Sequence, residues 1–232
     1  MTRCPRCGAL VSSGLCPACL LATALTVDDG PCPYDVLAPM AEDAAGTTYF
    51  AQGLAGRRSL AALKIYRPRP DVTAVLDRYA RWKPILDRFD HPHAARLLDV
   101  GLTSEGRLYK ATEYFAGFPL TALLTSSTTA TVTVDADVRR SLARQLASAV
   151  RAAHDVQLVH LDLTIQRVKA ATSRGPHVML LGLGSRAIFE GATGDPMGDV
   201  AGLVTLLRNI GVAVPESACE TAAAVEQALA TG

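Results

Sequence analysis

The nine residues His160-Leu161-Asp162-Leu163-Thr164-Ile165-Gln166-Arg167-Val168 form the most informative stretch of the chain. Three of them carry groups suited to proton or phosphate chemistry: an imidazole at His160, a carboxylate at Asp162 and a guanidinium at Arg167. A second stretch, Ala62-Leu63-Lys64-Ile65, lies about a hundred residues upstream and places a lysine inside an apolar strand pattern. Together the two stretches decide which fold the sequence indicates.

The first stretch resembles the catalytic loop of a protein kinase, H-R-D-L-K-P-x-N-I, and the second resembles the strand that carries the phosphate-binding lysine of kinases. The order of features around them also follows a bacterial, eukaryotic-like Ser/Thr kinase domain. The resemblance implies an α+β fold: a truncated, two-lobed, protein-kinase-like domain. Its N-lobe (strands plus helix αC) and hinge would cover residues 31–117, and its C-lobe residues 118–232.

Most of the catalytic groups of that family are replaced here. Asp162 keeps the position of the catalytic base, but Leu161 and Thr164 replace the usual arginine and lysine. Arg167 stands at the position of a metal-binding asparagine, and Gly182 at that of the D-F-G aspartate. Kinase catalysis depends on metal ions that bridge the phosphates, so the loss of both ligands predicts a catalytically inactive pseudokinase without bound Mg²⁺-ATP.

Lys64 occupies the position of the lysine that pairs with a helix αC glutamate in active kinases. The sequence has no Glu between Lys64 and Glu105, and the glutamate position falls on or near Trp82. Asp77 or Asp87 would be a shorter replacement in the wrong register. We therefore expect the activating ion pair to be lost.

The position of the glycine-rich loop keeps one glycine of three, Gly46, and carries Asp43 near the place of the phosphates. A carboxylate there repels phosphate, so we predict an ordinary hairpin turn. The hinge-like segment around Glu113 and Phe115 could still offer backbone groups to an adenine edge. The positions that a degenerate nucleotide site would use are therefore Lys64, Gly46, Glu113, Phe115 and Arg167.

Four cysteines at the start of the chain form two C-x-x-C pairs, Cys4/Cys7 and Cys16/Cys19. Two such pairs can supply the four thiolates of a tetrahedral structural zinc site, and they predict a small Cys4 zinc ribbon with its linker over residues 1–30. A redox pair or disulfides are the alternatives. Cys32 and Cys219 have no matching partners and are expected to be plain thiols.

Two helices of the C-lobe follow from the apolar pattern. Residues 138–154 show 3.6-residue spacing of apolar side chains, and residues 200–210 are apolar nearly all round and end at Gly211. Only a short helical segment, residues 221–230, remains to cover the second helix. Either this segment packs over it, or a second protein chain does, which predicts self-association or a partner at the C-lobe.

The composition excludes several classes of partner. A net charge of +1 suggests neither nucleic acid nor an anionic membrane, and no apolar run is long enough to span a bilayer. No signal-peptide core precedes the first cysteines, so we expect a cytoplasmic protein.

We interpret the chain as a regulatory or protein-binding scaffold. The alternatives are an atypical ATP-binding kinase or nucleotide-sensing regulator with metal-poor ligation, and a decayed product with little function.

Overall fold

The computed structural model of the chain describes residues 2–3, 10–11, 32–54, 60–125, 135–171 and 175–231. These residues divide into two compact units, one of residues 1–72 with 98–114 and the other of residues 73–97 with 115–232. The element expected as helix αC groups with the second unit. The first two short strands, β1 (Thr2–Arg3) and β2 (Leu10–Val11), pair antiparallel, and Cys4, Cys7, Cys16 and Cys19 lie outside the described residues.

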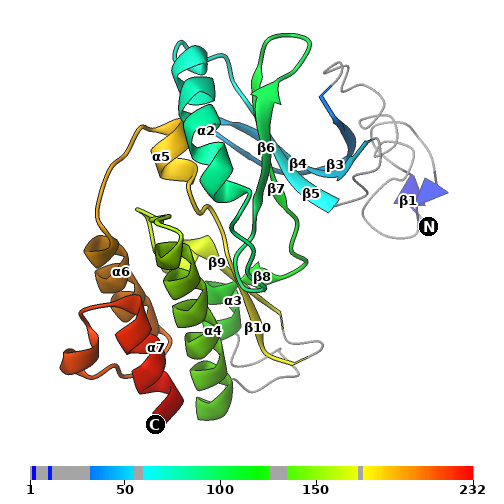
Figure 1. Cartoon of the computed structure of the whole chain (residues 1–232). Coiled ribbons are helices and arrows are strands. Elements are labelled where there is room, and N and C mark those ends of the chain that lie inside the picture. Colours follow the sequence, from blue (N-terminus) through cyan, green and yellow to red (C-terminus); the bar gives the residue numbers. More distant parts are fainter. Residues whose placement is uncertain are drawn as a thin grey trace. The chain divides into compact units, whose positions relative to one another are not determined.

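The first unit contains a five-stranded sheet (Figure 1) with the order β3-β4-β5-β7-β6. Its strands are β3 (Tyr34–Asp43), β4 (Gly46–Gly53), β5 (Leu60–Tyr66), β6 (Leu97–Leu102) and β7 (Leu108–Glu113). Alternate residues of β5 are buried, as expected for a strand with one face on a core. That core combines aliphatic and tyrosine side chains from four segments: Cys32, Tyr34, Ala51, Ala61, Leu63, Ile65, Tyr109 and Ala111.

The turn between β3 and β4 is a tight hairpin in which Asp43 pairs with Gly46. A Cβ atom at residue 46 would lie 2.1 Å from the carbonyl oxygen of Ile65, so only glycine allows β5 to approach this closely. The prediction of an ordinary hairpin turn is confirmed.

The second unit is built around α4 (Ala136–Asp155), whose first turn is capped by Asp135: its carboxylate accepts the backbone N–H of Val138 at 2.8 Å. The buried face of α4 consists of small and aliphatic side chains: Leu142, Ala143, Leu146, Ala147, Ala149, Val150 and Ala153. The other helices are α2 (Val72–Leu86), α3 (Leu120–Thr125), α5 (Ser185–Phe189), α6 (Pro196–Asn209) and α7 (Ala222–Thr231). A small sheet has the order β10-β9-β8, with β8 (Phe118–Pro119), β9 (Val168–Ala171) and β10 (His177–Leu180).

Helix α6 is covered within the second unit. The large apolar side chains of residues 200–210, which either the C-terminal segment or a second chain was expected to cover, are all buried: Val200, Leu203, Val204, Leu206, Leu207 and Ile210. Helix α7 packs along α4, beside which it lies in Figure 1, and also contacts α6. Of the two outcomes that the short C-terminus allowed, packing within the chain is the one observed. An uncovered α6 therefore gives no reason for self-association.

No helix among the described residues is long and apolar enough to cross a membrane.

Candidate functional site

The loop that precedes β9 is held by one buried carboxylate from α6. Asp199, in the first turn of that helix, is only 2% exposed. Its Oδ2 atom accepts the backbone N–H of His160 at 2.6 Å and lies 3.1 Å from Nε2 of His154. Its Oδ1 atom accepts the backbone N–H of Leu161 at 2.8 Å. Asp199 therefore braces the loop from α6.

The pKa of Asp199 reflects two opposing effects. Burial raises the pKa of the carboxyl. The hydrogen bonds from His154 and from the two backbone N–H groups lower the pKa, and their combined effect is larger than that of burial. The net pKa lies below its usual value, so the carboxylate is ionised at neutral pH. A charged acceptor strengthens each of the bonds that fix the loop.

His160 is a packed loop residue and not an accessible base. It is 1% exposed, and burial lowers the pKa of its imidazole. Its Nδ1 atom accepts the backbone N–H of Asp162 at 3.3 Å, and its Nε2 atom lies 2.9 Å from the carbonyl oxygen of Leu181. A neutral ring with the proton on Nε2 satisfies both contacts, so the imidazole is fully used in holding the loop.

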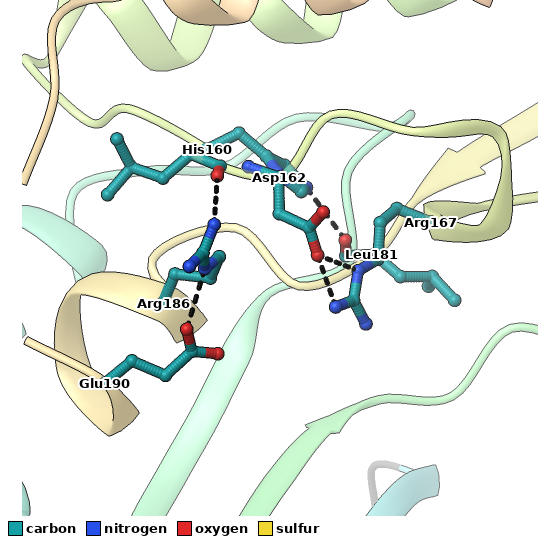
Figure 2. Close-up of polar contacts among 7 residues, drawn as sticks. His160, Asp162, Arg167, Leu181, Arg186 and Glu190 are labelled. Carbon is teal, nitrogen blue, oxygen red and sulfur yellow. Dashed lines mark hydrogen bonds and ion pairs between the residues drawn. The ribbon is translucent and has the colours of Figure 1, made fainter. Parts of the chain in front are cut away.

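Leu161 takes up a left-handed backbone conformation, with φ of 67°. Such a conformation is unfavourable for a residue with a Cβ atom, by about 1–2 kcal/mol. Both of its backbone polar groups are tied: the N–H to Asp199, and the carbonyl oxygen to Nη1 of Arg186 at 3.0 Å. Arg186 in turn donates to Glu190 at 2.8 Å (Figure 2). These contacts offset the cost of the strained residue.

Asp162, at the position of a catalytic base, forms an ion pair with Arg167. The Nε atom of Arg167 donates to Oδ2 of Asp162 at 2.7 Å, and its Nη2 atom donates to the same oxygen (Figure 2). Arg167 belongs to the single turn η1 (Ile165–Arg167), and its carbonyl oxygen accepts the N–H of Leu181 at 2.7 Å. Gly182 follows directly. The three positions that would carry acid and metal chemistry in an active kinase thus lie together and hold one acid, one arginine and one glycine.

These residues do not fit a Mg²⁺ ion. Mg²⁺ prefers octahedral coordination by oxygen atoms, commonly with one or two carboxylates. The Asp162 carboxylate already binds a guanidinium, and Gly182 has no side chain. Among the described residues, no group of three or more His, Cys, Asp or Glu is arranged to hold a metal ion.

In the first unit, Lys64 on β5 pairs with Asp43 at the hairpin turn. Its Nζ atom lies 2.5 Å from Oδ2 of Asp43, while Oδ1 accepts the backbone N–H groups of Ala45 and Gly46. The hydrogen bond from Lys64 is the main cause that lowers the pKa of Asp43 below its usual value. Asp43 therefore neutralises Lys64, a role that sequence reasoning missed because it depends on the register of three strands.

The other positions considered for a nucleotide site, and one acid considered as a partner of Lys64, lie as follows. Gly46 begins β4 at the close approach to β5. Glu113 ends β7 opposite Ala61. Phe115 belongs to the second unit, where its ring lies 5.5 Å from that of His177. Of the two acids considered as partners for Lys64 on or near helix α2, Asp87 instead pairs with Lys83 at 2.7 Å.

The sequence matches no family model and no curated protein. Solved structures similar to this chain include the kinase domain of Mycobacterium tuberculosis PknI, with a TM-score of 0.60, 21% identity and coverage of 79% of this chain and 77% of that one. A second structure of the PknI kinase domain, a variant with one substitution, gives a TM-score of 0.61 at 21% identity and covers 89% of this chain and 91% of that one. The chain therefore has a protein-kinase-like fold. At this level of identity the likeness establishes the fold alone.

Proposed function

We propose that this chain is a catalytically inactive pseudokinase that acts as a regulatory or protein-binding scaffold. The observation that carries the proposal is that Arg167 and Gly182, which lie beside Asp162, offer no side-chain oxygen at the positions of the kinase metal ligands. In this arrangement the one retained acid of the catalytic loop is bound by a cation from the chain itself, at the place where kinases hold metal ligands.

The chemistry of phosphoryl transfer supports this reading. Catalysis of that reaction is almost entirely positioning and neutralisation of charge on the phosphates, which bound metal ions provide. A protein with no oxygen ligands at the metal positions lacks the largest electrostatic contribution. Asp162 alone can accept a proton, but it cannot hold the group to be transferred.

The pairing of Lys64 is a second, independent support. In active kinases the corresponding lysine is held by a glutamate and faces the nucleotide phosphates. Here Lys64 instead donates a hydrogen bond to Asp43, which lies in the hairpin at the position of the glycine-rich loop. A nucleotide phosphate would have to displace this carboxylate and would also meet its negative charge.

Thermal unfolding with and without Mg²⁺-ATP tests the proposal. We expect no shift in Tm for the wild-type protein and no phosphoryl transfer to itself or to generic substrates. The double variant Gly182→Asp with Arg167→Asn restores oxygen ligands. A Cβ at residue 182 would meet only the Cδ atom of Arg167, at 3.9 Å, but φ of 89° at Gly182 is unfavourable for a residue with a side chain, so the backbone must adjust to accept the aspartate.

The restored variant should gain a Mg²⁺-dependent shift more readily than it gains turnover, because the glutamate and glycine-loop functions stay absent. The matched control is Asp162→Ala, which should leave every kinase assay unchanged. Wild-type autophosphorylation that Asp162→Ala abolishes would overturn the proposal.

The alternative is an atypical ATP-binding kinase or a nucleotide-sensing regulator. It is favoured by the retention of both Lys64 and Asp162, and by Arg167, whose guanidinium suits a phosphate as well as a carboxylate. A large Tm shift in the wild-type protein would select this alternative. If the shift needs Mg²⁺, the protein resembles a kinase; if it does not, Arg167 is the expected phosphate contact, and Arg167→Gln should remove the shift.

The N-terminal zinc ribbon is also a proposal. Cys4, Cys7, Cys16 and Cys19 would supply four thiolates to one Zn²⁺ in a closed, structural site. Elemental analysis should find about one zinc per chain. Replacing any one cysteine by Ser should release the metal without changing the unfolding of the kinase-like units. Metal-free protein in which alkylating reagents modify all four thiols would exclude the site.

A further inference from the structure

A cavity of about 340 Å³ opens in the second unit. It lies where the start of α4 meets the end of α7 (Figure 1), next to the loop that follows α6. Eight residues from these three segments line it: Ala136, Arg139, Arg140, Gly211, Val212, Ala213, Ala228 and Leu229. None of them takes part in the site described above.

The charge of this cavity is positive. Among the described residues that line it, the charged ones are both arginines, Arg139 and Arg140. Arg139 is fixed in place, because its Nη1 atom donates to the carbonyl oxygen of Ile210 at 2.8 Å. Gly211 lies beside this guanidinium and has φ of 80°, a left-handed conformation that favours glycine. Arg140 is exposed at the rim.

The opposite wall is apolar and built from small side chains. Ala213 and Ala228 contribute only methyl groups, and Val212 and Leu229 complete the surface. The wall is held to α4, because Nε of Arg144 donates to the carbonyl oxygen of Leu229 at 2.6 Å. The cavity therefore combines a fixed apolar wall with a cationic rim.

We propose that this cavity binds a short acidic peptide segment of a partner protein, with one aliphatic side chain against the α7 wall and neighbouring carboxylates on Arg139 and Arg140. Arginine guanidinium groups suit carboxylates because they can donate two parallel hydrogen bonds. The volume of about 340 Å³ lies at the lower end of the range for small-molecule sites, about 300–1,000 Å³, so an aliphatic side chain can enter it together with the adjoining peptide backbone. The inference rests on the proposed scaffold function and names the class of partner.

A fluorescein-labelled peptide of alternating Glu and Leu is the probe, and fluorescence anisotropy with the full chain is the measurement. We expect saturable binding that weakens as salt is added, since the contacts are partly ionic. Arg140→Gln should weaken binding about tenfold, the loss of one charge-assisted contact. Ala213→Leu should weaken it at least as much by filling the cavity from an exposed loop position. The matched control is Arg81→Gln, which removes one exposed positive charge on α2 and should change the affinity less than twofold, as expected for a remote exposed charge.

Equal losses in Arg140→Gln and Arg81→Gln would show that the peptide responds to overall charge, and would overturn the proposal. So would the absence of saturable binding up to about 1 mM peptide. Circular dichroism of each variant separates loss of binding from loss of fold. Mg²⁺-ATP titration of the same samples tests the proposed inactivity separately. The peptide site and the proposed inactivity can therefore be refuted independently of each other.

Discussion

Replacement of Asp199 by Asn is the most informative test of the loop architecture. The buried carboxylate accepts hydrogen bonds from the backbone of His160 and Leu161 and lies within hydrogen-bond distance of His154. An Asn side chain has one oxygen where Asp has two. If that oxygen keeps the place of Oδ2, the new NH₂ group faces the N–H of Leu161, and two donors meet.

The expected cost can be worked from these contacts. An unsatisfied buried donor costs about 1–3 kcal/mol, and hydrogen bonds to a neutral acceptor are roughly half as strong as those to a charged one. Leu161 also loses the contact that holds its left-handed backbone. Asn avoids part of the cost of burying a charge, which works in the other direction. We expect a net loss of about 3 kcal/mol, a large share of the 5–15 kcal/mol that is typical of a folded domain.

Urea unfolding at neutral pH measures this loss, with circular dichroism and the fluorescence of Trp82 as signals. Trp82 is the only tryptophan of the chain and lies on α2 in the same unit. The control is Asp162→Asn, another aspartate of the same region. Its carboxylate is partly exposed and pairs with an exposed arginine, so this change should cost less than about 1 kcal/mol. Equal losses in the two variants, or a loss below about 1 kcal/mol for Asp199→Asn, would refute the bracing role.

Asp199 should also make the free energy of unfolding depend on pH in the acid range. The pKa of Asp199 is lower in the folded protein than in the unfolded chain, so its stabilisation is complete above the unfolded value of about 4. The stabilisation is lost as the pH falls from there through the folded pKa. Asp199→Asn should remove that part of the acid destabilisation, whereas Asp162→Asn should leave it in place.

Three further predictions concern other positions. Burial lowers the pKa of His91, His93 and His160, so their contribution to stability is complete above about pH 6.5 and falls as the pH drops below it. Urea unfolding between pH 7 and 5 should show this loss. A His93→Asn variant whose free energy of unfolding falls just as steeply with decreasing pH would contradict the prediction. Gln157 is exposed, follows the C-cap residue Val156 of α4 and has φ of 62°, so Gln157→Gly should stabilise the protein by about 1 kcal/mol, seen as a higher Tm; a lower Tm would speak against this reasoning. Gly46→Ala should cost about 2 kcal/mol or more in urea unfolding, because the added methyl group would overlap a carbonyl oxygen of β5; a neutral result would mean that the hairpin adjusts freely.

The sequence predicted the elements whose side chains carry a strong pattern. Strand β5, Leu60–Tyr66, contains the stretch of residues 62–65 that is expected as a strand, and α4 extends the expected residues 138–154 by two residues at its start and one at its end. These features depend on local periodicity or on one short motif, and both can be read along a single stretch of chain.

The sequence did not predict features that depend on register or on short local geometry. The pairing of Asp43 with Lys64 needs the register of β3, β4 and β5, which a one-residue shift would change. Helix α5 has only five residues, too few for a periodic signal. Helix α6 begins earlier than expected, at Pro196, although Asp195 as a capping residue and the proline after it are readable start signals.

The two ion pairs do not by themselves explain why the protein would be unable to use a nucleotide. Exposed ion pairs contribute about 0–1 kcal/mol, so a phosphate could replace Asp162 on Arg167, or Asp43 on Lys64, at the cost of roughly a fivefold loss in affinity. The oxygen ligands missing at residues 167 and 182 matter more, because no rearrangement of the present side chains supplies them. Restoring those ligands is therefore the decisive change, whereas breaking either ion pair alone, by Asp43→Ala or Arg167→Ala, should not create a Mg²⁺-dependent site.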